Sequence, residues 1–472
     1  MTHASVSDSP VDGRRTAGRE LVEQALYIAR SAVGPDPDDW IQVEVPSPSI
    51  APEALVIAFP REECVFWSPP SGLVTVGLGV AASFLGEGSN RFASLRRQAE
   101  KLWPRLSVAG FDSRPLLGSP RLFGGFAFSP VGGRSQAWSS FGPARFVLPT
   151  ITYVQRGNQS ALTVALRRSE LSQGASAPPL RLLERVAAVV ASAGELPAIK
   201  SSGGEIRREN DPAAYRARVA DIVARIAAGQ FDKVMTAQEV RLHFLRGPDA
   251  GATSLALRDP TSGCCRFMFR FGGAAFLGAT PECLLDKRGM HLETEALAGT
   301  AARGEGGEGQ RLQASPKILD EHRLVVSDIA DSLSPLCEQL EVAEVPEVRQ
   351  LRHLLHLCTP IRGRLAEQRH VLELIESLHP TPAVGGSPRA PALAWIEQNE
   401  PFDRGWYAGA IGWFDSAGDG LFNVALRSGL VNGDAVCLYA GAGIVRDSAP
   451  DAEYEETTLK LRSLRAALHS SP

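Results

Sequence analysis

Acidic side chains recur at helical spacing in two segments of the second half of the chain. Glu321 and Asp328 lie seven residues apart, and Glu453 and Glu456 lie three apart, with Lys460 four residues further on. Residues at these spacings share one face of a helix, so each segment presents carboxylates on one side. Mg²⁺ prefers one or two carboxylates, several waters and an anionic substrate. The pattern therefore indicates either a magnesium site at Glu321 and Glu456 or two solvated helix faces with ordinary ion pairs.

Lysine is rare in this chain, which gives each lysine extra weight. The sequence holds 49 Lys and Arg residues, and six of them are lysines, which leaves 49 − 6 = 43 arginines. Arginine stays protonated in proteins, whereas a neutral lysine amine can accept a proton. The six lysines are therefore the cationic positions at which base chemistry is possible.

Several common catalytic signatures are missing from the sequence. It contains no GK[ST] phosphate loop, no GxSxG nucleophile elbow and no HExxH metal motif. His353 and His356 lie three residues apart on a possible helix, and we expect packing or a hydrogen bond there rather than metal ligation. The carboxylates are therefore the main chemical signal.

The second half of the chain has a clear pattern of helices and strands. Asp211 and Pro212 form a capping pair, and the apolar residues that follow are spaced as in a helix that stops at Gly229. A strand is predicted over residues 231–244, with Lys233 near its start. Further helices are predicted to open at Ser315, His370 and Pro450. Further strands are predicted over residues 266–271, 275–277, 284–293, 406–414, 421–430 and 435–439.

The first half is predicted to be rich in strands. Residues 1–18 are expected to form a disordered tail, residues 19–200 an N-terminal strand-rich half, and residues 205–470 the catalytic region. Helices are predicted over residues 93–103 and 180–193, and the Gly- and Ser-rich stretch 194–210 is the expected boundary. The strands of this half are predicted over residues 73–80, 123–128, 146–153 and 161–166.

Composition and charge narrow the classes of function. The chain is 44% hydrophobic and 22% charged, with a net charge of −4, which is typical of a globular protein. Because Lys and Arg form no dense cluster, we expect no nucleic-acid partner and no membrane surface. The seven cysteines include no CxxC pair and favour reduced thiols, and therefore a cytoplasmic protein.

The order of motifs in the second half resembles that of the chorismate-utilising enzymes. The matching segments are residues 231–234 (FDKV), 276–282 (FLGATPE), 296–300 (ALAGT), 321–322 (EH), 359–362 (TPIR), 379–386 (HPTPAVGG), 441–444 (GAGI) and 453–457 (EYEET). Eight ordered matches over about residues 205–470 exceed what chance would give. Within the family, the chain looks most like a siderophore-type isochorismate synthase. The first half is similar more loosely, through residues 124–128.

The resemblance implies a fold and a reaction. The fold would be α+β, of the chorismate-binding type found in anthranilate synthase component I, with two strand-rich halves and helices around a central active site. The reaction would be the Mg²⁺-dependent interconversion of chorismate and isochorismate. Water attacks ring carbon 2 while the hydroxyl group on carbon 4 leaves. The product would supply salicylate- or siderophore-type biosynthesis.

The resemblance also implies roles for the acid, the base and the metal ligands. Lys233 matches the general base, which burial and a nearby metal would keep neutral, and otherwise it is a strand-edge lysine. Glu282 matches the general acid and would stay protonated in an apolar pocket, or else be a turn carboxylate. We expect these two residues on opposite sides of the substrate ring. Glu321 and Glu456 match the metal ligands, together with Glu453.

Further matching positions would bind the substrate. Arg427 and Lys460 match cationic contacts for the two substrate carboxylates, and the backbone N–H of Gly441 can approach these groups. Tyr407 and His356 match positions that orient the pyruvyl group and the ring, although core packing explains each of them nearly as well. Gly299, Thr300 and Ala383 complete the expected substrate pocket.

Ala383 bears most directly on the product. Relatives that make anthranilate, aminodeoxychorismate or salicylate commonly carry Thr here, whereas Ala is typical of isochorismate synthases. Nothing in the chain resembles a glutamine amidotransferase, so we expect no such subunit and a monomer or weak dimer. A salicylate synthase and a chorismate-family pseudoenzyme remain the alternatives. Ile318 and Ala301 depart from the family pattern, where many relatives have Asp and Arg.

Overall fold

The strands form one branched sheet that runs through both halves of the chain. The computed structural model describes residues 10–32, 36–110, 116–192, 204–259, 263–304 and 306–469. In this part of the chain, strand pairings connect 21 strands. The branch lies at β6 (Ala144–Arg156), whose first residues pair with β5 (Arg121–Phe126) and whose last residues pair with β7 (Gln159–Arg167). β3 (Val74–Leu85) pairs with β6 along its length.

Two arms of the sheet leave this branch, and we call them the first and second arm. The first arm continues from β3 through neighbouring strands in the order β2 (Cys64–Ser68), β10 (Cys265–Phe271), β11 (Ala274–Thr280), β20 (Ser428–Asn432), β21 (Ala435–Ile444) and β9 (Lys233–Phe244). The short strands β8 (Glu205–Glu209) and β17 (Gly386–Ser387) pair with β9.

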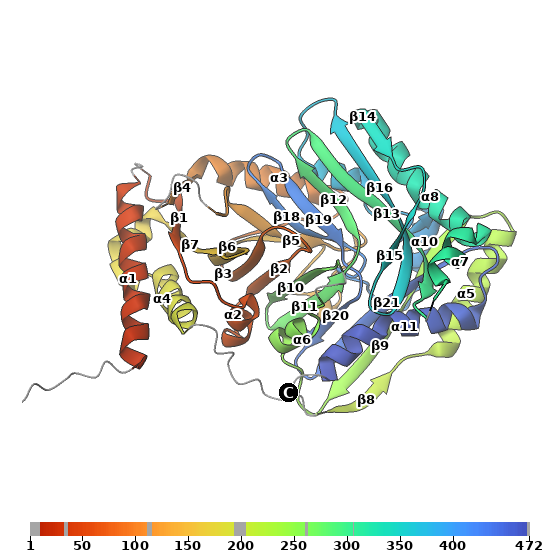
Figure 1. Ribbon diagram of the computed structural model, residues 1–472, viewed down its shortest axis with the longest axis horizontal. Coiled ribbons are helices and arrows are strands. Elements are labelled where there is room, and N and C mark those ends of the chain that lie inside the picture. The colour runs from red at the N-terminus through yellow and green to blue at the C-terminus, as the bar shows by residue number, and fades with distance from the viewer. Residues whose placement is uncertain are drawn as a thin grey trace, which may run out of the picture.

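The second arm is built only from strands of the second half once it leaves β5. It continues in the order β18 (Ala410–Asp415), β19 (Gly420–Val424), β12 (Cys283–Arg288), β13 (His291–Ala302) and β16 (Leu354–Leu365). The strands β14 (Cys337–Val342) and β15 (Glu347–Gln350) both pair with β16. Figure 1 shows the two arms above and below one another, with a large helical layer at one side.

The N-terminal end of the molecule is a helix pair on a small extension of the sheet. β1 (Trp40–Pro46) pairs with β7 and with β4 (Leu106–Gly110). Helix α1 (Pro10–Ser31) packs against α4 (Pro178–Ala191) through buried residues such as Val22 and Leu26. Helix α1 therefore begins inside the expected tail of residues 1–18, and residues 1–9 lie outside the described residues. A helix seeded by a buried apolar face extends into polar neighbours at little cost.

The helices of the second half cover the open end of the two arms, as Figure 1 shows. Helix α8 (Pro316–Leu333) packs against β13, and α11 (Pro450–His469) packs against β21 and α5 (Pro212–Ala227). The remaining helices are α2 (Pro52–Ala58), α3 (Arg91–Leu102), α6 (Ala250–Ala256), α7 (Glu308–Ala314), α9 (Val371–Leu378) and α10 (Arg389–Asn399). No helix among the described residues is long and apolar enough to cross a membrane.

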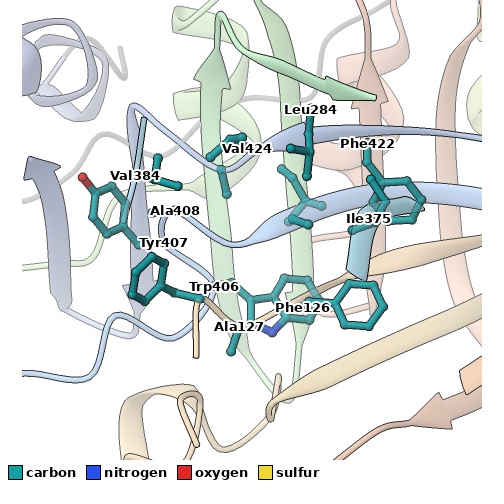
Figure 2. Packing of buried hydrophobic residues seen from close by; sticks show 14 of the residues in the cluster. Phe126, Ala127, Leu284, Ile375, Val384, Trp406, Tyr407, Ala408, Phe422 and Val424 are labelled. Carbon is teal, nitrogen blue, oxygen red and sulfur yellow. The ribbon is translucent and has the colours of Figure 1, made fainter. Parts of the chain in front are cut away.

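An aromatic core fills the space between the arms. Phe126 and Phe146 of the first half pack against Phe422 of the second half, and Trp406 packs against Phe269. In Figure 2, Trp406 lies beside Phe126, and Tyr407 extends from the same turn toward Val384. Large aromatic side chains contribute most of the buried apolar area in such a core. The same core therefore holds both halves together and supports the segment that carries Tyr407.

Two expected strands are interrupted where the backbone takes a left-handed conformation. The strand predicted over 284–293 is a hairpin, because Gly289 has φ +57° and separates β12 from β13. The strand predicted over 421–430 is broken at Arg427, whose φ is +51°, so β19 and β20 lie in different arms. Hydrophobic pattern alone does not mark such a change of direction.

Other strand and helix starts differ from expectation as well. The strand predicted from residue 406 begins only at Ala410, because Trp406–Gly409 forms a turn with φ +57° at Ala408. Asp211 caps α5 as expected, since its carboxylate accepts a hydrogen bond from the Ala214 N–H at 2.9 Å. Ser315 stands at the N-cap of α8 but its side chain makes no capping bond.

Candidate active site

One cavity of about 240 Å³ lies at the open end of the two arms. Its walls come from β9 and β21 of the first arm, from β13 and β16 of the second arm, and from helices α8 and α11. Every site residue that the sequence indicated lines this cavity: Lys233, Glu282, Gly299, Thr300, Glu321, His356, Ala383, Tyr407, Arg427, Gly441, Glu453, Glu456 and Lys460. The sequence separation of these residues reaches 227 positions, so the fold alone brings them together.

Lys233 and Glu321 meet inside the cavity. Lys233 is the first residue of β9 and is 1% exposed, and its Nζ lies 2.9 Å from Oε1 of Glu321 on α8. A Cβ atom at Gly443 of β21 would lie 2.5 Å from that carboxylate oxygen and 2.8 Å from the Cε of Lys233. Glycine at this position therefore provides the room in which the two side chains meet.

Helix α11 contributes a second pair of opposite charges. Glu453, Glu456 and Lys460 all line the cavity, as expected for residues on one helix face. Lys460 Nζ lies 2.6 Å from Oε1 of Glu456 and donates a hydrogen bond to the Gly441 carbonyl oxygen at 2.9 Å. The lysine thus fixes the carboxylate of Glu456 at the edge of β21.

The carboxylates of this cavity fit a hard divalent cation that keeps part of its water shell. Glu321 and Glu456 each hold one lysine ammonium group, so each already faces a positive charge. Within the described ranges, no three His, Cys, Asp or Glu side chains gather closely enough to enclose a metal by themselves. Mg²⁺ is commonly held by one or two carboxylates with water and substrate oxygens as the other ligands. The donor set is consistent with that chemistry.

Glu282 is a buried carboxyl group in the turn between β11 and β12. It is 4% exposed and lines the cavity. Burial raises the pKa of Glu282 to about 8, and the charge of Glu295 adds to this effect, whereas Lys233 and Arg349 oppose it. The ion pair of Lys233 is with Glu321 and not with Glu282. Glu282 is therefore protonated at neutral pH and can donate a proton.

His356 links the two arms at the floor of the cavity. Its Nε2 atom accepts a hydrogen bond from Nη2 of Arg427 at 2.9 Å, because a guanidinium group has no acceptor. The proton must then lie on Nδ1, which is 3.2 Å from the Gly299 carbonyl oxygen and 3.2 Å from Oγ1 of Thr300. Burial and the neighbouring Arg427 lower the pKa of His356 well below its usual value, so the ring is neutral.

The possible helix around His353 and His356 is a strand from Leu354 onward. His356 lies on β16, where it is opposite Thr300 of β13. The two histidines therefore do not share a helix face. Because β16 pairs with β13, His356 contacts the motif of residues 296–300. His356 hydrogen-bonds with Gly299, Thr300 and Arg427, which agrees with the hydrogen-bonding role that the sequence favoured.

Two aromatic rings and one small side chain form another wall. Tyr407 stacks on Tyr439 with ring centroids 5.2 Å apart, and burial raises the pKa of Tyr407 to about 12. Its neutral hydroxyl would lie 3.2 Å from a Cβ atom at Gly441. Ala383 is 8% exposed and lies beside Val384 in the same wall. Larger side chains at residues 383 and 441 would intrude on this part of the cavity.

The sequence did not indicate the buried ion pair of Arg404 and Glu400. The guanidinium of Arg404 donates to the carbonyl oxygens of Met235 at 2.8 Å and Val384 at 3.0 Å, and it lies 2.7 Å from Glu400. Glu400 also accepts the Ala237 N–H at 2.7 Å. The pair thus ties β9 to the segment that carries Ala383. Glu400 and Arg404 are four residues apart, but this spacing alone does not indicate contacts with the backbone of Met235, Ala237 and Val384.

Ile318 is one of the two departures from the family pattern, and it lines the cavity. Its Cγ2 atom would lie 2.4 Å from a Cβ atom at Gly299, which has φ +78°. Ala301 follows on β13, opposite Leu355 of β16. An apolar side chain at 318 therefore packs on the glycine that shapes this wall.

Comparisons with known proteins agree with this geometry. The sequence profile of the family described as chorismate binding enzyme matches residues 32–469. The chain is 38% identical over 412 residues to the salicylate biosynthesis isochorismate synthase of Pseudomonas aeruginosa, an alignment that covers 86% of this chain and 84% of that protein. It is 35% identical over 418 residues to the isochorismate synthase MenF of Bacillus subtilis, which covers 85% and 87% of the two chains.

Solved structures show the same fold. The menaquinone-specific isochorismate synthase MenF of Escherichia coli superposes with a TM-score of 0.79 at 28% identity, covering 96% of this chain and 99% of that one. Anthranilate synthase component I of Streptococcus pneumoniae superposes with a TM-score of 0.66 at 18% identity, covering 84% and 93%. The expected α+β fold is confirmed. By its profile, its relatives and its fold, the chain belongs to the family of chorismate binding enzymes.

Proposed function

We infer that this chain is an isochorismate synthase, an isomerase that interconverts chorismate and isochorismate. The inference rests on one cavity that places a buried lysine, a buried protonated carboxyl group and two cationic side chains around a common space. Its relatives of similar length with this name support the assignment. We further propose that the product supplies salicylate- or siderophore-type biosynthesis in the cytoplasm.

We propose that the cationic side chains hold the substrate. Chorismate carries two carboxylates, and Arg427 and Lys460 both line the cavity of a chain whose net charge is −4. The guanidinium of Arg427 is turned inward by its left-handed backbone and held by the neutral ring of His356. Charge-assisted hydrogen bonds from such fixed donors orient an anion and favour its transfer from water. Tyr407, Thr300 and the backbone at Gly299 and Gly441 would shape the remaining walls.

We propose that Lys233 and Glu282 carry out the proton transfers. The Lys233 ammonium group that pairs with Glu321 first gives up its proton. The neutral amine then takes a proton from water as the oxygen of that water bonds to ring carbon 2, the two ring double bonds shift, and the bond from carbon 4 to its hydroxyl oxygen breaks. Glu282 gives its proton to the departing hydroxyl group, so one water enters and one leaves. The step leaves an ammonium group at Lys233 and a carboxylate at Glu282, which is the state that the reverse reaction needs.

We propose that Glu321 and Glu456 hold Mg²⁺, with Glu453 beside them. When bound, the ion would offset negative charge on the substrate carboxylate and on these two side chains. The remaining residues do not need the ion in order to meet, since the ion pairs of Lys233 and Lys460 already set their positions. We propose that the enzyme acts alone on chorismate, as a monomer or weak dimer and without a glutamine amidotransferase.

The test is to give the purified protein chorismate and Mg²⁺ and to follow both organic products. We expect isochorismate to form up to an equilibrium mixture, and the same mixture to be reached from isochorismate. No pyruvate should appear in an assay coupled to lactate dehydrogenase, and ammonium salts should give no aminated product. Pyruvate released in step with the loss of chorismate would contradict the proposal and indicate a salicylate synthase. Chorismate left unconsumed would indicate a pseudoenzyme.

A further inference from the structure

A further ion pair flanks Glu282 and is not part of the cavity lining. Glu295 of β13 and Arg349 of β15 approach to 2.5 Å between Oε1 and Nη1. β13 pairs with one edge of β16 and β15 pairs with the other edge, so the two strands are not neighbours. The side chain of Arg349 therefore reaches across one strand. The two side chains are 29% (Arg349) and 13% (Glu295) exposed, so the pair is largely shielded from water.

This pair holds the backbone on both sides of Glu282. Nη1 of Arg349 donates to the carbonyl oxygen of Pro281 at 3.1 Å, and Oε1 of Glu295 accepts the N–H of Cys283 at 3.0 Å. Both contacts use the same nitrogen and oxygen atoms that form the ion pair. The peptide groups before and after Glu282 are thus attached to one rigid unit on β13 and β15.

The carbonyl group of Glu282 is also fixed, by the other neighbouring strand. It accepts hydrogen bonds from Nδ2 of Asn423 at 2.9 Å and from the N–H of Val424 at 3.2 Å. The backbone of Glu282 is therefore held from β19 on one side and from the ion pair on the other. Its side chain is left to line the cavity.

We propose that the Glu295–Arg349 ion pair is the positioning device of Glu282, which it holds in place and surrounds with two opposed charges. The inference rests on the proposed role of Glu282 as general acid. A buried ion pair adds little to stability by comparison with apolar residues of the same size. This pair instead contacts the backbone on both sides of one buried carboxyl group, which indicates that it positions this group.

The charges of the pair act on Glu282 in opposite directions. Glu295 raises the pKa of the Glu282 carboxyl group, whereas Arg349 lowers it, together with Lys233 of β9 and Arg427 of the β19–β20 turn. The thiol of Cys358 on β16 lies 3.6 Å from Oε2 of Glu295, and burial raises its pKa to about 12. This thiol is therefore neutral and adds no charge to the balance.

Substitutions that remove one charge of the pair at a time can distinguish a positioning role from general stabilisation, because only a positioning role changes how kcat/KM depends on pH. Glu295→Gln removes the negative charge, so the alkaline limb of kcat/KM against pH should move to lower pH, by on the order of one unit. Arg349→Gln removes the positive charge, so the same limb should move to higher pH. The double variant should return the limb toward wild type while kcat stays at least about tenfold lower, because the ion pair that fixes the two backbone contacts is lost.

The matched control is another Glu–Arg pair whose glutamate also lies on β13. Glu293 of β13 and Arg362 of β16 lie 3.4 Å apart, but both side chains are about two-thirds exposed, at 68% and 67%. Glu293→Gln and Arg362→Gln should change neither kcat nor the pH of the alkaline limb of kcat/KM. If Arg349→Gln fails to fold, Arg349→Lys keeps the charge and should leave the limb in place while lowering kcat.

The charge effect can be read without turnover. Difference infrared spectra of the ligand-free protein, taken against Glu282→Gln, follow the protonated C=O band of Glu282 as pH rises. The midpoint of this band should fall in Glu295→Gln and rise in Arg349→Gln, even if chorismate is not the substrate. Midpoints that stay constant, or that move the same way in both variants, would overturn the inference. An inactive wild type with opposed midpoints would instead refute only the proposed function.

Discussion

The Nζ atom of Lys233 lies 2.9 Å from Oε1 of Glu321, so the proposed base and a proposed metal ligand are partners in one ion pair. Both side chains are largely withdrawn from water, at 1% and 16% exposure, which strengthens their interaction. A cation that binds Glu321 competes with the lysine ammonium for the same carboxylate. Metal binding and the protonation of the cavity are therefore linked through this one contact.

The first prediction concerns the carboxylates of α8 and α11. Glu321→Gln and Glu456→Gln should each lower isochorismate formation at least about 100-fold at low Mg²⁺, because the amide gives a cation no charge. Thermal unfolding of Glu456→Gln should stay near wild type, and high Mg²⁺ should restore part of the rate of both variants. The exposed neighbour Glu455 offers the control Glu455→Gln, which should behave as wild type. Activity that is unaffected by EDTA would rule out the metal role.

The second prediction concerns Lys233. Lys233→Ala should lose about 10²–10⁴ in kcat with the fold retained, since general base catalysis contributes in this range. Lys233→Arg should be no better, because guanidinium cannot accept a proton near neutrality. Lys101→Ala, at an exposed helix end, is the control and should be fully active. A near-normal rate in Lys233→Arg would show that the residue supplies charge alone.

The third prediction concerns the pH dependence set by Glu282. Since the pKa of this buried carboxyl group is raised to about 8, activity that needs its proton should decline as pH rises through 8. Glu282→Gln should lose at least about 100-fold in kcat at every pH. A pH–rate profile with no alkaline limb between pH 7 and 9 would contradict the assignment.

Glu282 also links pH to stability. A carboxyl group whose pKa is raised on folding binds its proton more tightly in the folded chain, so its contribution to stability falls as pH rises from about 4.5 through 8. Glu282→Gln removes this penalty. The variant should therefore unfold at a higher temperature than wild type at pH 8, with the difference shrinking toward pH 5. Differential scanning calorimetry of both proteins at the two pH values measures this, and equal Tm values would contradict the raised pKa.

The fourth prediction concerns the small side chain at 383. Ala383→Thr should lower kcat/KM for isochorismate formation about tenfold or more, because a hydroxyl and a methyl group would enter an enclosed wall. Ala383→Ser adds the hydroxyl without the methyl and should be less impaired. Steady-state kinetics of the two variants, with pyruvate followed in parallel, separates the effect of volume from that of polarity. Equal rates in Ala383→Thr and wild type would show that this wall does not touch the substrate.

The fifth prediction concerns Arg404. Arg404→Lys keeps the charge but cannot reach two carbonyl oxygens and Glu400 at once, so the free energy of unfolding should fall by about 2 kcal/mol or more. KM for chorismate should rise, since the Val384 carbonyl beside Ala383 loses its donor. Arg462→Lys, an exposed substitution on α11, should change neither quantity. Urea unfolding and initial rates give the two readouts.

Much of the candidate site was visible in the sequence because its residues lie in short, ordered motifs. Lys233, Glu282, Glu321 and Glu456 each stand in a segment whose neighbours carry the same resemblance, and all four line one cavity. The ion pairs around them were not visible. Glu295 and Arg349 are 54 residues apart, and no spacing rule connects them. Arg404 is only four residues from Glu400, but its carbonyl partners Met235 and Val384 are distant in sequence.

The fold was predicted best where hydrophobic period and capping residues agree. Helix α5 begins after Asp211 as expected, and the apolar residue Val219 lies on its buried face. Prediction failed at reversals within apolar stretches, such as Gly289 between β12 and β13 and Arg427 between β19 and β20. A reversal of this kind is set by a single backbone dihedral, and the surrounding side-chain pattern does not change.

Because the sheet branches at β6, the two halves of the chain depend on each other for folding, and their sequences should also evolve together. β2 pairs with β10, and β5 pairs with β18. In each arm, the strands of the second half therefore begin next to a strand of the first half. A gene fragment that encoded residues 205–470 alone would leave β10 and β18 as bare edges beside uncovered aromatic side chains, which favours aggregation. None of the described residues that line the cavity belongs to the first half, yet β2 and β5 of that half start both arms on which the cavity is built. Recombination between relatives should therefore succeed only when both halves are exchanged together.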